Sequence, residues 1–412
     1  MKIKNILLCS AATLLVTATA ANAEAAKVVA NKAHVVKKHV VKKKVVKAPV
    51  KSAAANADAG YISVPGTSSA VKIYGRVAEQ ATYGDALAQS EAIANHSKHR
   101  IALDTSARIG FETKSNTSLG VVHSKFEIHG DIDTTKNNND DKGKIIYHYT
   151  DNLHTQIHFA YVEIGGIRFG IDESIFTTFP GGFGNVNNDG ILNNFEDGQV
   201  VSAVSYTKAW NNGFSAIAGL EMYDRSASPK KISYEEKGYN AANFVGGVKY
   251  EQGWGDIVGV AAYDGQHKSK SARVRVDGKI NDKLSLFALG SIKTLDDDYK
   301  RVTIDGKDKF YRNNDISLYS NWDGKWELIA GGSYSITPAL SFNAQAGVTE
   351  AKTVAASADL NYEIAHNFFI SPEIAYISWN DDSKHKFGEI EATNAMKGKH
   401  QVQALLYVCK KF

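Results

Sequence analysis

Cysteine is nearly absent from this chain of 412 residues, which contains only Cys9 and Cys409. Cys9 lies in an N-terminal stretch that we expect to be cleaved, so a single thiol remains. A single thiol excludes an intramolecular disulfide and a metal or redox site built on paired cysteines. Proline is also scarce, with 6 residues. The chain has 34 glycines and 41 aromatic residues (17 Phe, 5 Trp and 19 Tyr), a composition that favours an all-β chain.

Long apolar runs are missing after the first residues, which excludes a helical membrane domain. Lys2 and Lys4 precede an apolar stretch over residues 6–20, and Ala-Asn-Ala follows at 21–23. This order predicts a secretory signal peptide at 1–23. A spanning helix would need roughly 20 apolar residues, more than this stretch offers. The slightly negative mean hydropathy of −0.28 suits a β-barrel, in which only alternate residues face lipid.

Basic charge is concentrated near the N-terminus, where residues 24–51 hold nine lysines and one glutamate. The quasi-repeat HVVKKHVVKKKVVKAPVK lies within this stretch. Such density of like charge predicts that residues 24–59 form a disordered, solvated segment on the periplasmic side. The functional alternative is an electrostatic tether, in which the stretch Lys27–Lys51 contacts anionic peptidoglycan or lipid head groups. Nucleic acid is not an expected partner, because an exported chain rarely meets any.

Alternating polar and apolar residues begin near Ala70 and continue to the C-terminus. Over residues 100–112, apolar side chains at 101, 103, 105, 107, 109 and 111 share one face of the expected strand, and charged or small residues share the other. A soluble sandwich would bury the apolar face between two sheets. A transmembrane barrel turns the apolar face to lipid and the charged face to a wet lumen.

Connection lengths decide between these two folds. Short turns are expected at 113–117, 165–166, 210–213, 252–255, 281–283, 337–339 and 366–367. Longer polar connections are expected between them, near 83–98, 130–153, 174–199, 224–240, 265–270, 295–315, 350–353 and 380–399. This alternation predicts an all-β, transmembrane antiparallel β-barrel of about 16 strands over residues 60–412, with short periplasmic turns and long outer loops. We place its strands at 70–82, 99–112, 118–129, 154–164, 167–174, 200–209, 214–223, 241–251, 256–264, 270–280, 284–294, within 316–334, and at 340–349, 354–364, 368–379 and 400–412.

Two details of this layout are specific expectations. Pro372 lies inside an expected strand of a closed barrel, so a bulge or a misplaced boundary is expected there. Trp210 and Trp254 fall at turns, and Trp322, Trp326 and Trp379 near the outer ends, as interfacial girdles require.

The third long connection, at 174–199, is rich in Gly, Asn and Asp. A loop of this length inside a compact domain is unusual and often functional. Gly181, Gly182 and Gly184 would allow it to approach the wall closely, and its asparagines suit compact turns. We expect this loop to fold into the lumen and narrow the channel.

A family resemblance supports this layout. The segment GYISVPGTSSAVKIYGRV at 60–77 resembles the entry segment of alphaproteobacterial outer-membrane general porins, and 160–176 looks like their hairpin before the constriction loop. The terminal Phe412 is similar to the aromatic end that the outer-membrane assembly machinery recognises. The resemblance covers 60–412 and implies a sixteen-stranded trimeric porin that passes small hydrophilic solutes. The family's usual Cys pair near the entry is absent, and Ala70 stands where one member would fall.

A channel of this kind needs a transverse field at its constriction, made by charges of opposite sign. The acidic candidates lie on the loop and at its root: Asp172, Glu173, Asp189, Glu196 and Asp197. The basic candidates lie on the expected lumen face of the early strands: Lys72, Arg76, Arg100, Arg108, Lys125 and Arg168. Arginine suits a permanent field because it stays charged at any accessible pH. For any single residue, an ordinary lumen or loop charge is the alternative interpretation.

No metal, cofactor or catalytic site is predicted. Oxygen ligands on the loop lack the order of an EF-hand. His154 and His158 would lie roughly 13 Å apart on a strand, too far for one ion. The sequence therefore predicts a passive outer-membrane diffusion channel, exported through a cleaved signal peptide, with outer-membrane lipids and lipopolysaccharide as neighbours and a homotrimer implied by the resemblance. An adhesion or ligand-binding barrel for haemin or a host surface, and less directly a barrel hydrolase, are the alternatives.

Overall fold

The computed structural model describes residues 60–87, 100–134, 153–192, 200–223, 242–313 and 317–412. Its first strands are β1 (Ile62–Ser63), β2 (Ser69–Gly84), β3 (Arg100–Thr117), β4 (Gly120–Thr134), β5 (Leu153–Ile164), β6 (Ile167–Glu173), β7 (Val200–Ala209), β8 (Phe214–Met222) and β9 (Asn243–Gln252). The remaining wall strands are β10 (Gly255–Asp264), β11 (Ser269–Lys279), β12 (Leu284–Lys293), β15 (Trp326–Thr337), β16 (Leu340–Thr349), β17 (Thr353–Ala365), β18 (Phe368–Trp379) and β21 (Lys399–Lys411).

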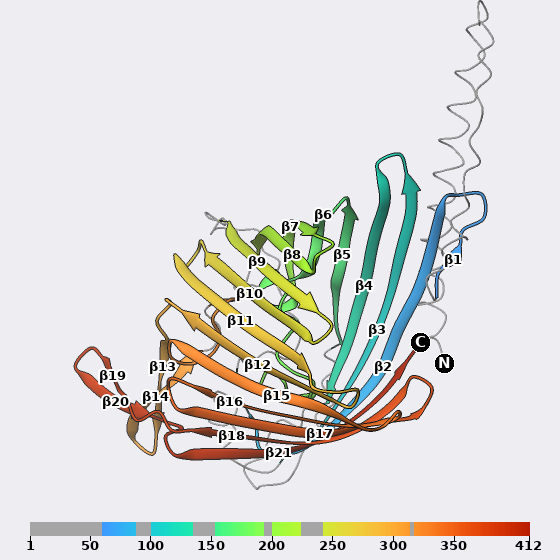
Figure 1. Cartoon of the computed structure of the whole chain (residues 1–412). Coiled ribbons are helices and arrows are strands. Elements are labelled where there is room, and N and C mark those ends of the chain that lie inside the picture. The colour runs from blue at the N-terminus through green and yellow to red at the C-terminus, as the bar shows by residue number, and fades with distance from the viewer. Residues whose placement is uncertain (1–59, 88–99, 135–152, 193–199, 224–241, 314–316) are drawn as a thin grey trace, which may run out of the picture. The chain divides into compact units, whose positions relative to one another are not determined.

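Sixteen of these strands, β2 to β12, β15 to β18 and β21, form one closed antiparallel barrel. Each pairs with its neighbour along the chain, and the circle closes where β21 pairs with β2, from Arg76–Lys411 to Gly84–Gln403. Figure 1 shows this seam, where the blue β2 runs beside the red β21. Closure leaves the wall without a free strand edge, which is the condition for a sheet to cross a membrane. The predicted fold class is confirmed.

Side chains on the two faces of the wall differ sharply. Large apolar residues on the outward face are exposed, for example Val248 and Ile292 at 62% and Leu328 at 55%. Polar and charged residues on the inward face are buried, among them Arg273, Glu327 and Glu373. A soluble protein would bury the apolar set, whereas a barrel in lipid exposes it. The alternation in the sequence therefore corresponds to a barrel with an apolar outer face and a polar inner face.

The expected strand positions agree closely with the structure, with three corrections. β3 continues to Thr117 and turns at 118–119, so the turn expected at 113–117 is wrong. The connections after β10 and β16 span only 265–268 and 350–352 and are as short as turns. The strict alternation of long and short connections therefore fails at these two places, although the strand count is right.

The connections expected as loops at 295–315 and 380–399 contain regular structure. They form a separate four-stranded sheet from β13 (Asp298–Ile304), β14 (Lys307–Asn313), β20 (Ile390–Asn394) and β19 (Lys384–Phe387), in that order. These strands are short, and the expectation of loops is wrong because two separate connections supply the strands that complete the sheet.

Pro372 is accommodated without the expected bulge. It lies within β18, whose predicted bounds are confirmed, and it pairs in register with Leu406 of β21. Towards β17 the ladder skips two positions and resumes at Tyr362–Ile370 in the same register. The missing proline N–H interrupts the pairing on one side and does not shift it. The register shift of this strand pair lies elsewhere, between Glu363 and Ala365.

The tryptophans only partly follow the expected girdles. Trp210 and Trp254 are about half exposed at turns, and Trp326 is exposed at the opposite end. Trp322 and Trp379 are buried in hydrophobic clusters at 0% and 2% exposure, so their expected interfacial position is wrong. The one described helix, α3 (Ile175–Thr178), has four residues, and no helix in the described part of the chain could cross a membrane.

The C-terminus and Gly75 meet at the seam, and this contact gives the first prediction. The backbones of Gly75 and Phe412 exchange two hydrogen bonds, and a Cβ on Gly75 would lie 2.4 Å from the carbonyl oxygen of Arg108 and 2.5 Å from the Phe412 ring. We expect Gly75→Ala to destabilise the barrel by about 1–3 kcal/mol, the usual cost of overpacking. The midpoint of heat-induced unfolding, followed by the gel shift of folded barrels, measures this.

Gly259→Ala provides the matched control, since Gly259 also lies in a wall strand but a Cβ there meets open space. We expect its midpoint to stay at the wild-type value. Equal midpoints for both variants would contradict a structural role for the Gly75–Phe412 contact.

Candidate channel site

The inward face of β2 to β4 carries a group of basic side chains. Cross-strand partners share a face, and the register pairs Arg76 with Arg108, and Lys72 with Glu112, which in turn pairs with Lys125. Lys125 lies over the ring of Phe159 at 3.5 Å from its centroid. Four of the predicted bases therefore line one stretch of the lumen.

The two acids at the root of the loop have partners on the wall itself. Arg168 donates to Asp172 at 2.6 Å and to Glu163 through two bonds of 2.6 and 2.8 Å. Glu173 lies 2.6 Å from Nε2 of His158. Asp172 therefore pairs within β6 and Glu173 contacts the neighbouring β5, and Arg168 is shared between Asp172 and Glu163 of β5.

Sequence patterns missed a pair of stacked histidines. His129 and His158 lie face to face with ring centroids 3.9 Å apart, and His129 contacts Glu127 at 2.5 Å. The ladder between β4 and β5 shifts register next to Glu127, and this irregularity brings His158 onto the same face as Phe159. Bulges leave no periodic trace in a sequence, so the pairing of these rings could not be read in advance.

A single buried carboxylate fixes the start of the long loop. Glu221 of β8 accepts hydrogen bonds from the amide of Ile175 at 2.6 Å and from the hydroxyls of Ser174 and Tyr319 at 2.9 and 2.8 Å. Ser174 also caps α3, because its Oγ accepts from the amide of Phe176. The loop therefore leaves the wall in one defined direction.

A second inward segment, at 317–323, supports this root. Tyr319 packs edge-on against Phe176 with centroids 5.6 Å apart, and Trp322 joins the same buried cluster. Asp264 of β10 accepts hydrogen bonds from the hydroxyls of Tyr223 at 2.8 Å and Ser317 at 2.6 Å. The bond to Ser317 holds the start of this segment against the wall. The sequence interpretation assigned this stretch to a region containing one strand and missed its role.

The loop then reaches β11. The Arg273 guanidinium lies between the rings of Phe176 and Phe183, 4.8 and 4.6 Å from their centroids, and also contacts Glu327 at 3.3 Å. Arg275 pairs with Asp277 and donates to the carbonyl of Gly182 at 3.1 Å. These two arginines were not among the sequence candidates, although they alternate on a strand that the pattern identified.

Farther along, the loop docks on β17 and β18. Glu373 accepts from the backbone amides of Asn187 and Asn188 at 2.6 and 3.0 Å, and from the side chain of Asn188 at 2.7 Å. Asp359 of β17 lies opposite Glu373 in the strand register and accepts a hydrogen bond from the side chain of Asn343. Since β6 and β18 are six strands apart by the shorter way round the barrel, residues 174–189 span its interior.

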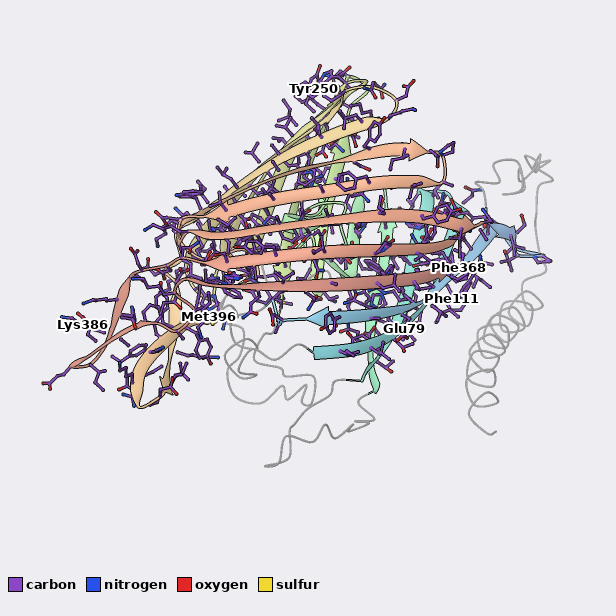
Figure 2. The ribbon with its side chains drawn as sticks, turned by 90° about the horizontal axis from the view of Figure 1, so that it is seen from below. Glu79, Phe111, Tyr250, Phe368, Lys386 and Met396 are labelled. Atoms are coloured by element: carbon purple, nitrogen blue, oxygen red, sulfur yellow. The ribbon has the colours of Figure 1, made fainter. Side chains whose placement is uncertain are left out.

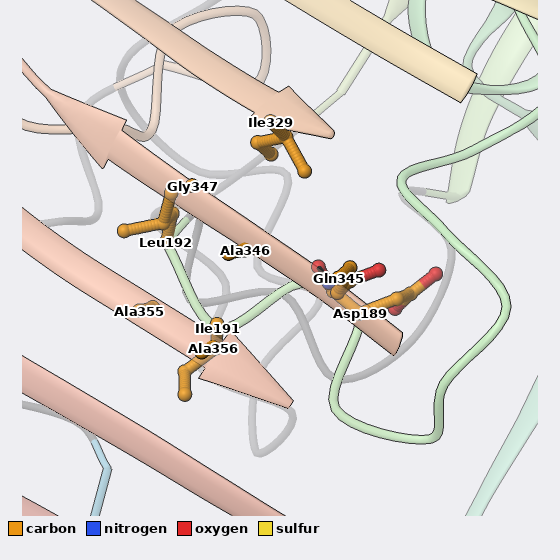
Figure 3. A pocket seen from close by; sticks show the side chains of 9 residues that line it. All are labelled: Asp189, Ile191, Leu192, Ile329, Gln345, Ala346, Gly347, Ala355 and Ala356. Atoms are coloured by element: carbon orange, nitrogen blue, oxygen red, sulfur yellow. Dashed lines mark hydrogen bonds between the residues drawn. The ribbon is translucent and has the colours of Figure 1, made fainter. Parts of the chain in front are cut away.

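Contact between loop and wall is close at Asp189 (Figure 3). Gln345 of β16 donates to the carbonyl of Asp189 at 2.8 Å, and a Cβ on Gly184 would lie 1.7 Å from the Gln345 side chain. The gap lined by Ile191, Leu192 and the strands beside them is about 10 Å³, the space of a single water. Burial raises the pKa of the Asp189 carboxyl to about 6.

The chain matches a known protein family over most of its length. A family description for the porin subfamily matches residues 40–405. The chain belongs to the porin subfamily. Among its relatives, porin Omp2b of Brucella suis is 30% identical over 357 residues, covering 82% of this chain and 86% of that protein. Porin Omp2b of Brucella canis is 31% identical over 340 residues, covering 81% and 85%. The protein is an outer-membrane diffusion channel.

Solved structures support the fold of this porin. The outer membrane channel DcaP of Acinetobacter baumannii superposes with a TM-score of 0.55 at 17% identity, covering 84% of this chain and 97% of that one. Salmonella typhi OmpF, in a complex with daunomycin, gives a TM-score of 0.52 at 12% identity over 85% and 100%.

The predicted residues of this porin occupy several kinds of place. Lys72, Arg76, Arg108, Lys125 and Arg168 lie on the inward face, and Arg100 is the first residue of β3. Asp172 and Glu173 pair with the wall, and Asp189 lies buried against β16. Glu196 and Asp197 lie outside the described residues. The described part of the loop contacts Arg273 and Arg275 of β11.

The anchoring of the porin's loop gives a second prediction. Glu373→Ala removes three hydrogen bonds to the loop, each of which contributes roughly 1.5–3 kcal/mol when the acceptor is charged. We expect amides near Asn187 and Asn188 to exchange hydrogen at least about tenfold faster, while amides of the wall keep their protection. Hydrogen exchange followed by mass spectrometry measures both.

Glu363→Ala is the control, because Glu363 also accepts a backbone amide, that of Asn367, but at a turn of the wall. It should leave exchange in the loop unchanged. Unchanged exchange in Glu373→Ala would show that the loop does not depend on this carboxylate.

Proposed function

We propose that the loop at 174–199 constricts this porin's channel and that small hydrophilic solutes and ions pass the remaining opening. The observation that carries the proposal is the chain of contacts from Glu221 through Arg275 to Glu373, which holds the loop across the lumen. A loop fixed at its root, at Gly182 and at Asn187 and Asn188 reduces the cross-section permanently. A loop lying on the outer surface would make none of these contacts.

The selectivity of this opening follows from the charges around it. The wall of β2 to β4 supplies Lys72, Arg76, Arg108 and Lys125, which form the positive side of the proposed field. Asp172 is compensated by Arg168, and Glu173 lies against His158. Asp189, whose pKa rises only to about 6, stays largely ionised near neutral pH and forms the negative side together with Glu196 and Asp197. Arg100 and Arg168 complete the proposed basic set. Oriented charges across a narrow pore select solutes by sign and dipole.

The organisation of the whole chain is part of the proposal. Residues 1–23 serve as the signal peptide, 24–59 as the Lys-rich periplasmic segment, and 60–412 as the barrel. Charge complementarity supports contact between Lys27–Lys51 and peptidoglycan, and the exposed apolar wall supports contact with outer-membrane lipids and lipopolysaccharide. The channel needs no catalytic group, and we assign no enzymatic role.

A homotrimer is the assembly that we propose. Support comes from the outward face, where Glu79 of β2 accepts a hydrogen bond from Thr105 of β3 at 2.5 Å. A carboxylate facing lipid is costly, so outward acidic groups suit a protein contact better. We therefore propose that the contact between subunits lies on the side of β2 and β3.

Planar-bilayer recording tests the constriction. We expect deletion of residues 181–194 to raise the single-channel conductance, because it removes the part of the loop that crosses the lumen. Shortening the β19–β20 hairpin by residues 385–390 is the control and should leave conductance unchanged. Equal conductance for the loop deletion and the wild type would place the constriction elsewhere, and a folded protein that carries no current would refute the channel itself.

The trimer is tested at Glu79. We expect Glu79→Trp to lower the temperature at which trimers dissociate to folded monomers on a mild detergent gel, because the indole does not fit a packed contact. Val248→Trp is the control, since Val248 is 62% exposed on β9, away from β2 and β3. A lower dissociation temperature for Val248→Trp alone would move the contact, and a monomer in mild extraction would remove it.

A further inference from the structure

The small sheet of β13, β14, β20 and β19 has one face dominated by lysine. Residues paired across neighbouring strands share a face, so the register places Val302, Lys309, Thr393 and Lys384 in one row across all four strands. The same face carries Lys300 opposite Tyr311, Lys307 opposite Ile304, and Lys386 opposite Glu391. We call Lys300, Lys307, Lys309, Lys384 and Lys386 the lysine face.

The opposite face of this sheet is packed. Tyr299, Phe310 and His385 contact one another, with centroids 4.4 to 5.8 Å apart, and Phe310 and Ala392 are buried. Packing on one side leaves the lysine face as the side that is open to a partner.

Two side chains fasten the sheet to the barrel. Arg312 donates to the carbonyls of Asn321 and Trp322 and contacts Asp297 at 3.2 Å. Met396, just after β20, is buried in a cluster with Ile377 and Trp379 of β18. Figure 2 shows Lys386 on the small sheet beyond the end of β18, farther out than Met396. The lysines are therefore held on a fixed scaffold and do not lie on a free chain.

Charge on the lysine face is largely uncompensated. Lys384 pairs with Glu391 at 2.7 Å, whereas the other four lysines make no ion pair with any described residue. Four of the five are exposed, and Lys309 is partly exposed. The register also puts Glu391 and Asp298 on this face, so five lysines stand against two acids. Because surface charges of both signs are usually interspersed, a rigid face with such a positive excess indicates a partner of the opposite sign.

We propose that the lysine face binds a sulfated polysaccharide outside the cell. This placement rests on the outer-membrane orientation of the porin, in which the long connections carrying the sheet lie on the outer side. Lysine-rich clusters suit polyanions such as heparin, because each ammonium is a point charge that accepts a sulfate from many directions. The site is distinct from the channel, and binding does not require passage through the lumen.

Two features favour a repeating glycan over a single lipid phosphate. The face holds five lysines and no arginine, so it lacks the planar fork that fixes one phosphate through two hydrogen bonds. The lysines are spread over three strands, roughly 5–10 Å apart across the sheet, which suits many weak contacts along an extended chain. Lysines on a sheet beyond the strand ends also meet partners from solvent more directly than partners in the membrane.

Surface plasmon resonance on the full-length protein in detergent tests the proposal, with heparin as the probe at physiological salt. A variant with all five lysines changed to glutamine should bind heparin at least about tenfold more weakly, given the usual contribution of exposed charge pairs. The same five positions changed to arginine should retain binding. Desulfated heparin should bind neither the wild type nor the arginine variant, and added salt should weaken the complex of heparin with the wild type.

The control variant changes five exposed lysines outside the sheet to glutamine: Lys208, Lys268, Lys270, Lys279 and Lys283. It removes the same charge and should keep wild-type affinity. The Lys-rich stretch at 24–51 is present in every variant, so differences between variants report on the sheet. Bilayer conductance recorded in parallel should match the wild type, which separates failure of this proposal from failure of the channel.

Three outcomes would overturn the proposal. Equal loss in the lysine-face and control variants would show a general charge effect. Undiminished heparin binding in the lysine-face variant would place any polyanion site elsewhere, such as the N-terminal segment. Loss of binding to lipopolysaccharide vesicles or to a DNA duplex, with heparin binding unaffected, would assign the face to a membrane or a nucleic acid instead.

Discussion

Backbone hydrogen bonding between β2 and β21 is the constraint on which the rest of the molecule depends. Every amide left unpaired in lipid costs several kcal/mol, so a sheet in a membrane must close on itself. The Gly75–Phe412 contact lies at that seam and joins the last residue to the first wall strand. Once the wall is closed, its interior is shielded from lipid, and polar side chains can be placed there freely.

The interior uses this freedom in two different ways. Between β2 and β6, bases, acids and the stacked histidines interact with one another within the wall. Between β8 and β18, the wall side chains turn instead to the loop: Glu221 holds its root, Arg275 its middle and Glu373 its far part. Wall carboxylates accept from loop amides, and Arg275 and Gln345 donate to loop carbonyls, so the loop is fixed mainly by its backbone. This explains why a segment rich in Asn and Gly is suitable here.

Much of the wall could be predicted, because a barrel imposes period-two alternation at nearly every position. The bounds of β7, β16 and β18 are confirmed at both ends, and the strand count follows from connections alone. What failed has a common cause. The small sheet, the segment at 317–323, the buried Trp322 and the His129–His158 stack all depend on contacts between distant connections or on a local irregularity. Such contacts leave no period in the sequence.

The candidate residues divide in the same manner. Alternation placed Lys72, Arg76, Arg108 and Lys125 on the correct face, but it could not show that the loop contacts Arg273 and Arg275 of β11. That choice has a consequence for assembly. Arg273 and Arg275 lie about a hundred residues after the loop root, and Glu373 nearly two hundred, so the loop's binding partners exist only when the later strands are in place. Contacts of such high sequence separation form late in folding. The loop can therefore dock only in the completed barrel, and the constriction that we propose would be missing from an unfinished one.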